Sequence, residues 1–426
     1  MKIVIINKSD RTGGAAMVSM RLMQAMRDAG IDARMLVVEK LTDSPYVVKA
    51  AGSLKIKWKF LVERLKIFIL NGFRRDTLFK IDTGAKGLPL WRHPLVKEAD
   101  AVLLNWVNQG MLSLSGIERM KRLNKPLIWT MHDMWCMTSL CHHAGGCTGY
   151  HSICNYCPLL GRLSPDKIES AMVWADKNRI YDTYPYMKFV AVSNWLYNRS
   201  KESSLLRYNK GVYVIPNVFP IDRIKEVNHP PLKGRKIRIG FGAARLDDPI
   251  KGFPVLIDMT RVLKEMYSEI ADELELVTFG GIKDASLFRE IAISHRHLGV
   301  VSGEDAIRKV YEEVDIVVSS SSYETLPGTL VEAQAYGCIP VSFNRGGQSD
   351  IIDHLQTGYI APYSSDMRQA AMNLSVGILW ACSKVVDEVE MELMRKVMQY
   401  EVRRRFSPQV VVDKYIRLIE ECKSNI

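Results

Sequence analysis

The chain has 426 residues, of which 47% are apolar and 25% charged. This length favours two domains, and the composition argues against a disordered, collagen-like or low-complexity protein. The apolar runs, such as Ile3–Ile6 and Phe68–Leu70, are far shorter than the roughly 20 residues that span a bilayer. The N-terminus enters a strand-like run directly, so no secretory signal is expected.

The net charge is +11, from 58 Lys and Arg against 47 Asp and Glu. An excess of this kind favours a negative partner, which can be a nucleic acid, a phosphate-bearing ligand or an anionic membrane. No helix-turn-helix, RNA-recognition or regular zinc-finger pattern accompanies it, so no nucleic acid is expected as a partner.

In chain order, apolar strand patterns alternate with helical patterns. The first half predicts a helix over Ala15–Ala29, where Val18, Leu22 and Met26 recur at helical spacing. The strands predicted around it are continuous apolar runs, as in parallel sheets covered on both faces. They are Lys2–Asn7, Arg34–Glu39, Ala101–Trp106, Leu127–His132, Phe189–Ser193 and Val212–Pro216.

The segment Val218–Gly234 interrupts this alternation with Pro220, Pro230 and Pro231 and reads as a linker. A second alternating run follows it, and the chain is helical in pattern from about Asp366. The elements predicted there are the strands Lys236–Phe241, Leu274–Phe279, Ile316–Ser319 and Ile339–Phe343 and the helix Gly328–Tyr336.

These patterns predict an α/β protein with two doubly wound, Rossmann-like domains facing each other across a cleft. We place the N-terminal domain at 1–217 and a linker at 218–234. The C-terminal domain spans 235–405, and a last helix at 406–426 is expected to pack back towards the N-terminal domain.

Doubly wound sheets bind ligands at the carboxyl ends of their strands, so the loops that follow strands are the candidate sites. Gly13 and Gly14 follow the first strand and open a helix, which permits close approach of an anion or makes a plain tight turn. His132 and Asp133 stand at the end of a later strand. His132 could bind a substrate hydroxyl or act as an acid or base, or the pair could only fix its loop.

Two further loops lie in the second domain. Arg245 and Lys251 flank a turn after its first strand and could clamp a diphosphate without a metal, unless they are ordinary solvated charges. Glu324 precedes a helix that carries Glu332, and the amides of Leu326–Thr329 between them form a potential anion site. Two carboxylates for hydroxyls and a set of amides for phosphate suit a nucleotide sugar.

The order of these motifs resembles that of retaining glycosyltransferases of family 4, which have the GT-B fold. The resemblance covers essentially the whole chain and rests on Glu324-x7-Glu332, Arg245 with Lys251-Gly252, Gly13-Gly14 and His132-Asp133. Two positions depart from the family pattern. Pro327 stands where members often carry Gly or an aromatic residue, and Asn217 is followed by Val218 where a glycine is common.

The resemblance implies transfer of a sugar from a UDP- or GDP-sugar to a glycan or lipid-linked acceptor, with retention and without a catalytic cofactor. It implies His132, Arg245, Lys251 and Glu324 as the catalytic residues. The implied donor-binding residues are Gly14, Arg245, Lys251, Glu324, Leu326, Pro327, Gly328, Thr329 and Glu332. The alternatives are a non-catalytic nucleotide-sugar binder and a nucleic-acid-binding protein with a zinc module.

A cysteine-rich loop spans 136–158. The thiols of Cys141, Cys147, Cys154 and Cys157 suit a structural zinc, and the Cys154-x2-Cys157 pair has the spacing of a usual half-site. Disulfides, free thiols or an iron–sulfur cluster are the alternatives. A zinc here would fix a loop on the acceptor side without taking part in catalysis.

Lysines and arginines alternate with aromatic and aliphatic residues over Leu54–Phe79. Part of this segment has the pattern of a basic amphipathic helix, which could lie on an anionic membrane or turn an apolar stripe to the core. We therefore expect a cytoplasmic protein that can associate peripherally with the inner face of the membrane.

Overall fold

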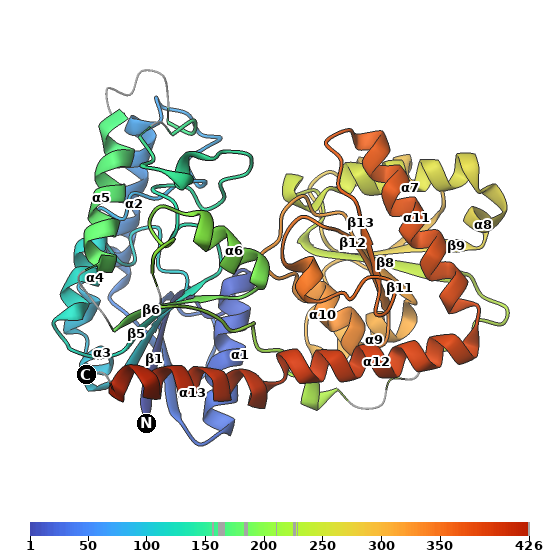
Figure 1. The fold of residues 1–426 in the computed structure, drawn as a ribbon. Helices are drawn as coiled ribbons and strands as arrows, with labels where there is room; N and C mark the ends of the chain where they lie inside the picture. Colours follow the sequence, from blue (N-terminus) through green and yellow to red (C-terminus); the bar gives the residue numbers. More distant parts are fainter. Residues whose placement is uncertain are drawn as a thin grey trace. The chain divides into compact units, whose positions relative to one another are not determined.

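The computed structural model describes residues 1–155, 157–160, 167–182, 186–209, 211–224, 227 and 229–424 (Figure 1). The chain forms two compact units. The first comprises Met1–Val218 together with Pro408–Ile426, and the second comprises Phe219–Ser407. Each unit is built on its own parallel sheet, which confirms the α/β prediction of two doubly wound domains.

The first unit contains a seven-stranded sheet in the order β3-β2-β1-β4-β5-β6-β7, with every neighbouring pair parallel. All residues of β4 and β5 are buried, which explains their unbroken apolar sequences. The strands are β1 (Lys2–Ser9), β2 (Asp32–Glu39), β3 (Val47–Lys49), β4 (Ala101–Leu104), β5 (Leu127–Met131), β6 (Met187–Ala191) and β7 (Val212–Val214).

Helices cover this sheet, and one of them comes from the far end of the sequence. α13 packs on α1 and adds Val411, Tyr415 and Ile419 to the first unit's core. The hydroxyl groups of Tyr415 and Thr130 are 2.9 Å apart in that core. The helices are α1 (Gly14–Asp28), α2 (Ser53–Leu70), α3 (Pro94–Glu98), α4 (Leu114–Lys121), α5 (Lys167–Asp182), α6 (Asn194–Glu202) and α13 (Pro408–Ser424).

The second unit contains a six-stranded parallel sheet in the order β10-β9-β8-β11-β12-β13. Its strands are β8 (Ile237–Arg245), β9 (Leu274–Gly281), β10 (Ser294–His297), β11 (Ile316–Ser319), β12 (Ile339–Phe343) and β13 (Tyr359–Ala361). Its helices are α7 (Phe253–Met266), α8 (Ser268–Asp272), α9 (Glu304–Glu313), α10 (Gly328–Ala335), α11 (Met367–Val385) and α12 (Glu388–Phe406).

The segment expected as a linker, 218–234, differs from that expectation. Val218 is buried in the first unit, and from Phe219 onwards the chain belongs to the second unit. Phe219 and Ile221 are buried, and the Phe219 ring stacks edge-on against Phe406. A 3-10 helix at Ile221–Arg223 follows Pro220, so the described start of this segment is packed into the second unit. The chain passes back to the first unit between Ser407 and Pro408.

Within the described residues, no helix combines the length and the apolar character needed to cross a membrane.

Candidate active site

The second sheet has a topological switch point between β8 and β11. β9 and β10 extend the sheet on one side of β8, and β11, β12 and β13 extend it on the other. Ligands of doubly wound sheets bind beside the carboxyl ends of the strands at such a point. The loops that leave β8 and β11 there carry Arg245, Lys251 and Glu324.

Lys251 and Glu324 meet at this edge. Their side chains form an ion pair, and Ser321 donates a hydrogen bond to the same carboxylate over 3.1 Å. The Ser320 hydroxyl bonds the Lys251 carbonyl oxygen over 2.9 Å, which joins the two loops a second time. The structure therefore brings together the lysine and the first glutamate that the sequence analysis singled out, although they are 73 residues apart.

A third loop, which follows β12, contacts the backbone of Glu324. The Gly347 N–H donates to the Glu324 carbonyl oxygen over 3.0 Å, and Glu324 pairs with Gly346 in a parallel bridge. A Cβ atom on Gly346 would lie 1.8 Å from that oxygen, so only glycine permits this approach. Sequence reasoning missed these residues. Their signal was a pair of glycines after a buried strand, the same signal that marked Gly13 and Gly14.

Arg245 lies at the end of β8, next to an irregularity in the strand pairing, and its expected role in holding a diphosphate stays a prediction. The β8–β9 pairing shifts register between Gly242 and Arg245, and such irregularities redirect side chains near binding sites. The Arg245 guanidinium contacts the carboxylates of its own loop, Asp247 at 3.5 Å and Asp248 at 3.2 Å. The structure therefore shows Lys251, and not Arg245, in contact with Glu324.

α10 begins directly after the Glu324 loop, with Pro327 as its N-cap residue. A proline side chain cannot cap a helix, so it takes none of the first N–H groups, including those of Gly328 and Thr329. Leu326 is buried beside them. One turn further along, the Glu332 carboxylate accepts a hydrogen bond from the Tyr311 hydroxyl over 3.3 Å.

The first unit has a switch point of its own, between β1 and β4. The loop after β1 turns on Ser9, whose hydroxyl oxygen accepts from the Arg11 and Thr12 N–H groups. Gly13 has a φ of +89°, which favours glycine, and α1 follows it. A Cβ atom on Gly14 would meet no atom within 4 Å, so the space at this helix N-terminus is open.

His132 follows β5 and borders a narrow cavity with Asn105, Thr130 and Tyr415. Burial lowers the pKa of His132 to about 4, against a weaker raising effect of Asp133. Its imidazole is therefore neutral at pH 7, a form that can exchange hydrogen bonds with a hydroxyl group.

Asp133 forms a close pair with His142, nine residues further along the chain. The His142 Nδ1 and Asp133 Oδ2 atoms are 2.6 Å apart, and Asp82 lies on the other side of the ring. Burial lowers the pKa of His142, but the two carboxylates outweigh it and raise the pKa to about 9. Arg64 holds Asp82 over 2.8 Å. Sequence reasoning missed this buried network, since its members are scattered from 64 to 142.

The cysteine-rich loop contains free thiols throughout. The Gly149 N–H donates a hydrogen bond to the Cys147 sulfur over 3.4 Å. The backbone N–H groups of Leu159 and Leu160 interact with the Cys157 thiol in the same way. Burial and the neighbouring thiols of Cys147, Cys154 and Cys157 together raise the pKa of Cys141 to about 12. In the described part of the chain, however, no three His, Cys, Asp or Glu side chains form a group that could hold a metal ion. The structural zinc therefore stays a prediction.

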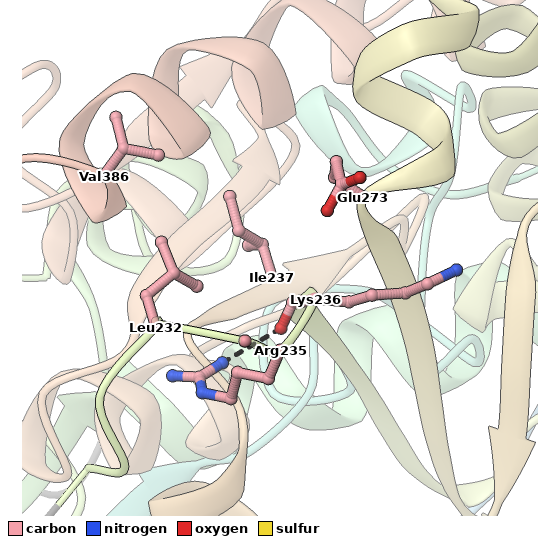
Figure 2. Close-up of a pocket in the computed structure, with 7 residues that line it drawn as sticks. Leu232, Arg235, Lys236, Ile237, Glu273 and Val386 are labelled. Carbon is pink, nitrogen blue, oxygen red and sulfur yellow. Dashed lines mark hydrogen bonds between the residues drawn. The ribbon is translucent and has the colours of Figure 1, made fainter.

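A cavity of about 490 Å³ opens at the amino-terminal end of β8, away from the loops described above. Figure 2 shows Arg235, Lys236, Ile237 and Glu273 around it. Arg235 forms a bidentate ion pair with Asp315, which ties the start of β8 to the start of β11. The cavity lies at the amino ends of the strands and contains none of the expected site residues.

Two doubly wound units, each built on a parallel sheet, are the architecture of the GT-B fold, which the solved structures below share. Residues 232–374 match the family model of glycosyl transferases group 1. This range includes Arg245, Lys251, Glu324 and Glu332. The matched range lies within the second unit, and glycosyl transfer is the activity that these comparisons support.

Three similar proteins align with most of the chain. WcaC of Escherichia coli K12, named as a colanic acid biosynthesis glycosyl transferase, is 23% identical over 364 residues, which cover 80% of this chain and 82% of WcaC. HepE of Anabaena, solved with UDP and glucose, has a TM-score of 0.59 at 14% identity, covering 99% of this chain and 100% of HepE. A glycosyltransferase from Rickettsia africae has a TM-score of 0.63 at 14% identity, covering 100% and 99%.

Proposed function

We propose that the chain is a retaining glycosyltransferase that moves a sugar from a nucleoside diphosphate sugar to a glycan or lipid-linked acceptor in polysaccharide synthesis. The observation that carries this proposal is the Lys251–Glu324 pair at the switch point of the matched domain. The name of WcaC supports a polysaccharide product, and the HepE complex with UDP-glucose supports a UDP-sugar donor.

The proposed chemistry follows from charge. The bond between the sugar C1 and the diphosphate oxygen breaks, and the leaving diphosphate takes the electron pair. Lys251 and the N–H groups at the start of α10 stabilise that charge, and Arg245 joins them when it exchanges its own loop's carboxylates for phosphate. These cationic and amide groups do the work without a catalytic metal ion.

The carboxylates position the donor. Glu324, released from Lys251 as the lysine turns to phosphate, accepts hydrogen bonds from hydroxyls of the donor sugar. Glu332, oriented by Tyr311, accepts from the ribose hydroxyls. In the first unit, the open helix N-terminus at Gly14 and the neutral His132 serve phosphate and a sugar hydroxyl.

Retention follows if the acceptor oxygen attacks C1 on the face from which the diphosphate leaves. The new C–O bond forms there, and the acceptor's hydroxyl proton passes to the departing phosphate oxygen. This front-face displacement needs no nucleophile from the protein.

The test is a thermal-shift screen with UDP-, GDP- and ADP-sugars, followed by donor turnover and by NMR of the product's anomeric configuration. We expect stabilisation by one nucleotide class and a retained configuration. Lys251→Ala should lower kcat by about 100-fold or more, since it removes one preorganised charge from the leaving group.

Lys264→Ala is the matched control, because Lys264 is also ion-paired in the second unit but lies on α7 against Asp272. Full activity of Lys251→Ala would refute the proposed role of Lys251, and an inverted product would refute retention. Donor binding without turnover or hydrolysis would make the chain a non-catalytic binder instead.

A further inference from the structure

α2 exposes a continuous apolar stripe along its whole length. The side chains recur at i, i+4, i+7, i+11 and i+15, the spacing of one helix face. Their exposed fractions run from 53% at Leu65 to 86% at Leu54. The members of this stripe are Leu54, Trp58, Leu61, Leu65 and Ile69.

This stripe is distinct from the face that α2 turns to the protein. The core-facing residues are Glu63, Arg64, Ile67 and Leu70, which are buried. Glu63 accepts hydrogen bonds from the Thr83 N–H and hydroxyl and from the Lys86 N–H. The first unit thus covers a mixed polar and apolar face of α2 and leaves the apolar stripe exposed.

The exposed charges of α2 itself are all basic. Glu63, the only acidic residue of α2, is buried, whereas Lys55 and Lys57 are exposed on either side of the stripe. Lys66, further along, pairs with Glu169 of α5, the helix beside α2 in Figure 1. Beyond the helix, Phe73, Phe79 and Arg75 are exposed, and Arg74 forms an ion pair with the exposed Asp76 over 2.7 Å.

From this arrangement we propose that α2 docks the protein on an anionic membrane surface. An apolar stripe bordered by lysines lies flat at a bilayer interface, with its leucines and tryptophan among the acyl chains and its lysines at the phosphates. Each lysine near such a surface adds attraction that salt weakens. This docking goes beyond the proposed transfer reaction and does not depend on it.

The experiment is flotation of the full chain, without a donor, with phosphatidylcholine vesicles and with mixed phosphatidylcholine–phosphatidylglycerol vesicles. We expect binding to the mixed vesicles only, weakened by salt. Leu61→Glu/Leu65→Glu should reduce the bound fraction about tenfold or more, because it places charge where leucines enter the interface. Lys55→Glu/Lys57→Glu should reduce binding as well.

α12 supplies matched controls. Leu393 is 65% exposed on that helix and Lys396 is also exposed, but the neighbouring residues include Glu388, Glu390 and Glu392. Leu393→Glu and Lys396→Glu should leave vesicle binding unchanged. A shift of tryptophan emission to shorter wavelength on binding should disappear in Trp58→Phe, which tests contact by α2 itself.

Equal binding of wild type and Leu61→Glu/Leu65→Glu would overturn the proposal, as would equal binding to neutral and mixed vesicles. So would an absence of vesicle binding combined with self-association that the same variant abolishes, because the stripe would then be covered by a second copy. Donor turnover is measured separately, so a failure of docking and a failure of the proposed transfer can be told apart.

Discussion

Gly252 connects Lys251 to α7 with a φ of +69°, in the left-handed region that favours glycine. The residue is also close to the β11 loop, since a Cβ atom there would lie 2.2 Å from the Ser320 carbonyl oxygen. Two constraints thus meet at one residue, and both keep the Lys251 turn against the loop that carries Glu324.

Replacing Gly252 with alanine should therefore harm the donor site as well as stability. The left-handed backbone alone costs an alanine about 1 kcal/mol, and displacement of Ser320 adds to that cost. Gly299→Ala is the control, because Gly299 has a φ of +70° but open space around its Cβ position. Urea unfolding should show a larger loss for Gly252→Ala, and donor affinity should fall in that variant alone. Equal losses in both variants would argue that only the backbone conformation matters.

At the scale of single elements, the cysteine-rich loop is tied to the first unit by a buried lysine. The Lys177 ammonium, on α5, donates to the carbonyl oxygens of Trp135, Thr138 and Ser139 over 2.6–3.0 Å. It also lies 3.6 Å from the centre of the Trp135 ring. The start of the loop is thus fixed by the fold itself, and the zinc prediction concerns the four thiols beyond it.

Metal analysis of the purified chain should find about one zinc per molecule if those thiols form a tetrahedral site. Cys154→Ser/Cys157→Ser should then lose the metal, because a hydroxyl group is a poor zinc ligand. Cys382→Ser should retain it, since Cys382 is buried on α11 of the other unit. Absence of zinc from the wild-type chain, with the loop thiols all titratable, would remove the prediction.

At the scale of the whole molecule, the last helix completes the first unit rather than the second. Ile419 of α13 is fully buried in the first unit's core, together with residues of α1 and β1. Ile419→Ala should therefore destabilise the first unit by about 2–5 kcal/mol through the cavity it leaves.

Hydrogen exchange followed by mass spectrometry can assign this loss to one unit. We expect faster exchange in peptides from 1–218 and 408–424, and unchanged exchange in peptides from 219–407. Val389→Ala is the control, because Val389 is 83% exposed on α12. Faster exchange throughout the chain would show that the two units unfold together.

Much of this fold could be predicted because strand and helix patterns are local. Ile316–Ser319 and Ile339–Phe343 were predicted with the bounds that the structure has, since buried parallel strands are continuous apolar runs. The ends of some strands differ from the prediction. Ala101–Trp106 was predicted two residues too long, because the apolar pattern continues through Trp106 after the ladder stops at Leu104.

The candidate site could be predicted only in part. A glycine-rich turn, a lysine after one strand and a glutamate before a helix are visible in sequence, because the chemistry requires those residue types near strand ends. The partner of each charge is not visible. Arg245 and Lys251 were both expected to hold a diphosphate, and the structure adds their present partners, which are Asp247 and Asp248 for Arg245 and Glu324 for Lys251.

The sequence by itself thus determined two α/β units, their switch-point loops and the residue types available there, since periodicity and turn chemistry depend on near neighbours along the chain. Tertiary structure alone decided that Asp133 pairs with His142, that α13 belongs to the first unit and that the apolar stripe of α2 faces solvent. Each of these depends on which distant segments share a core, and residue spacing along a single helix or strand carries no information about that choice.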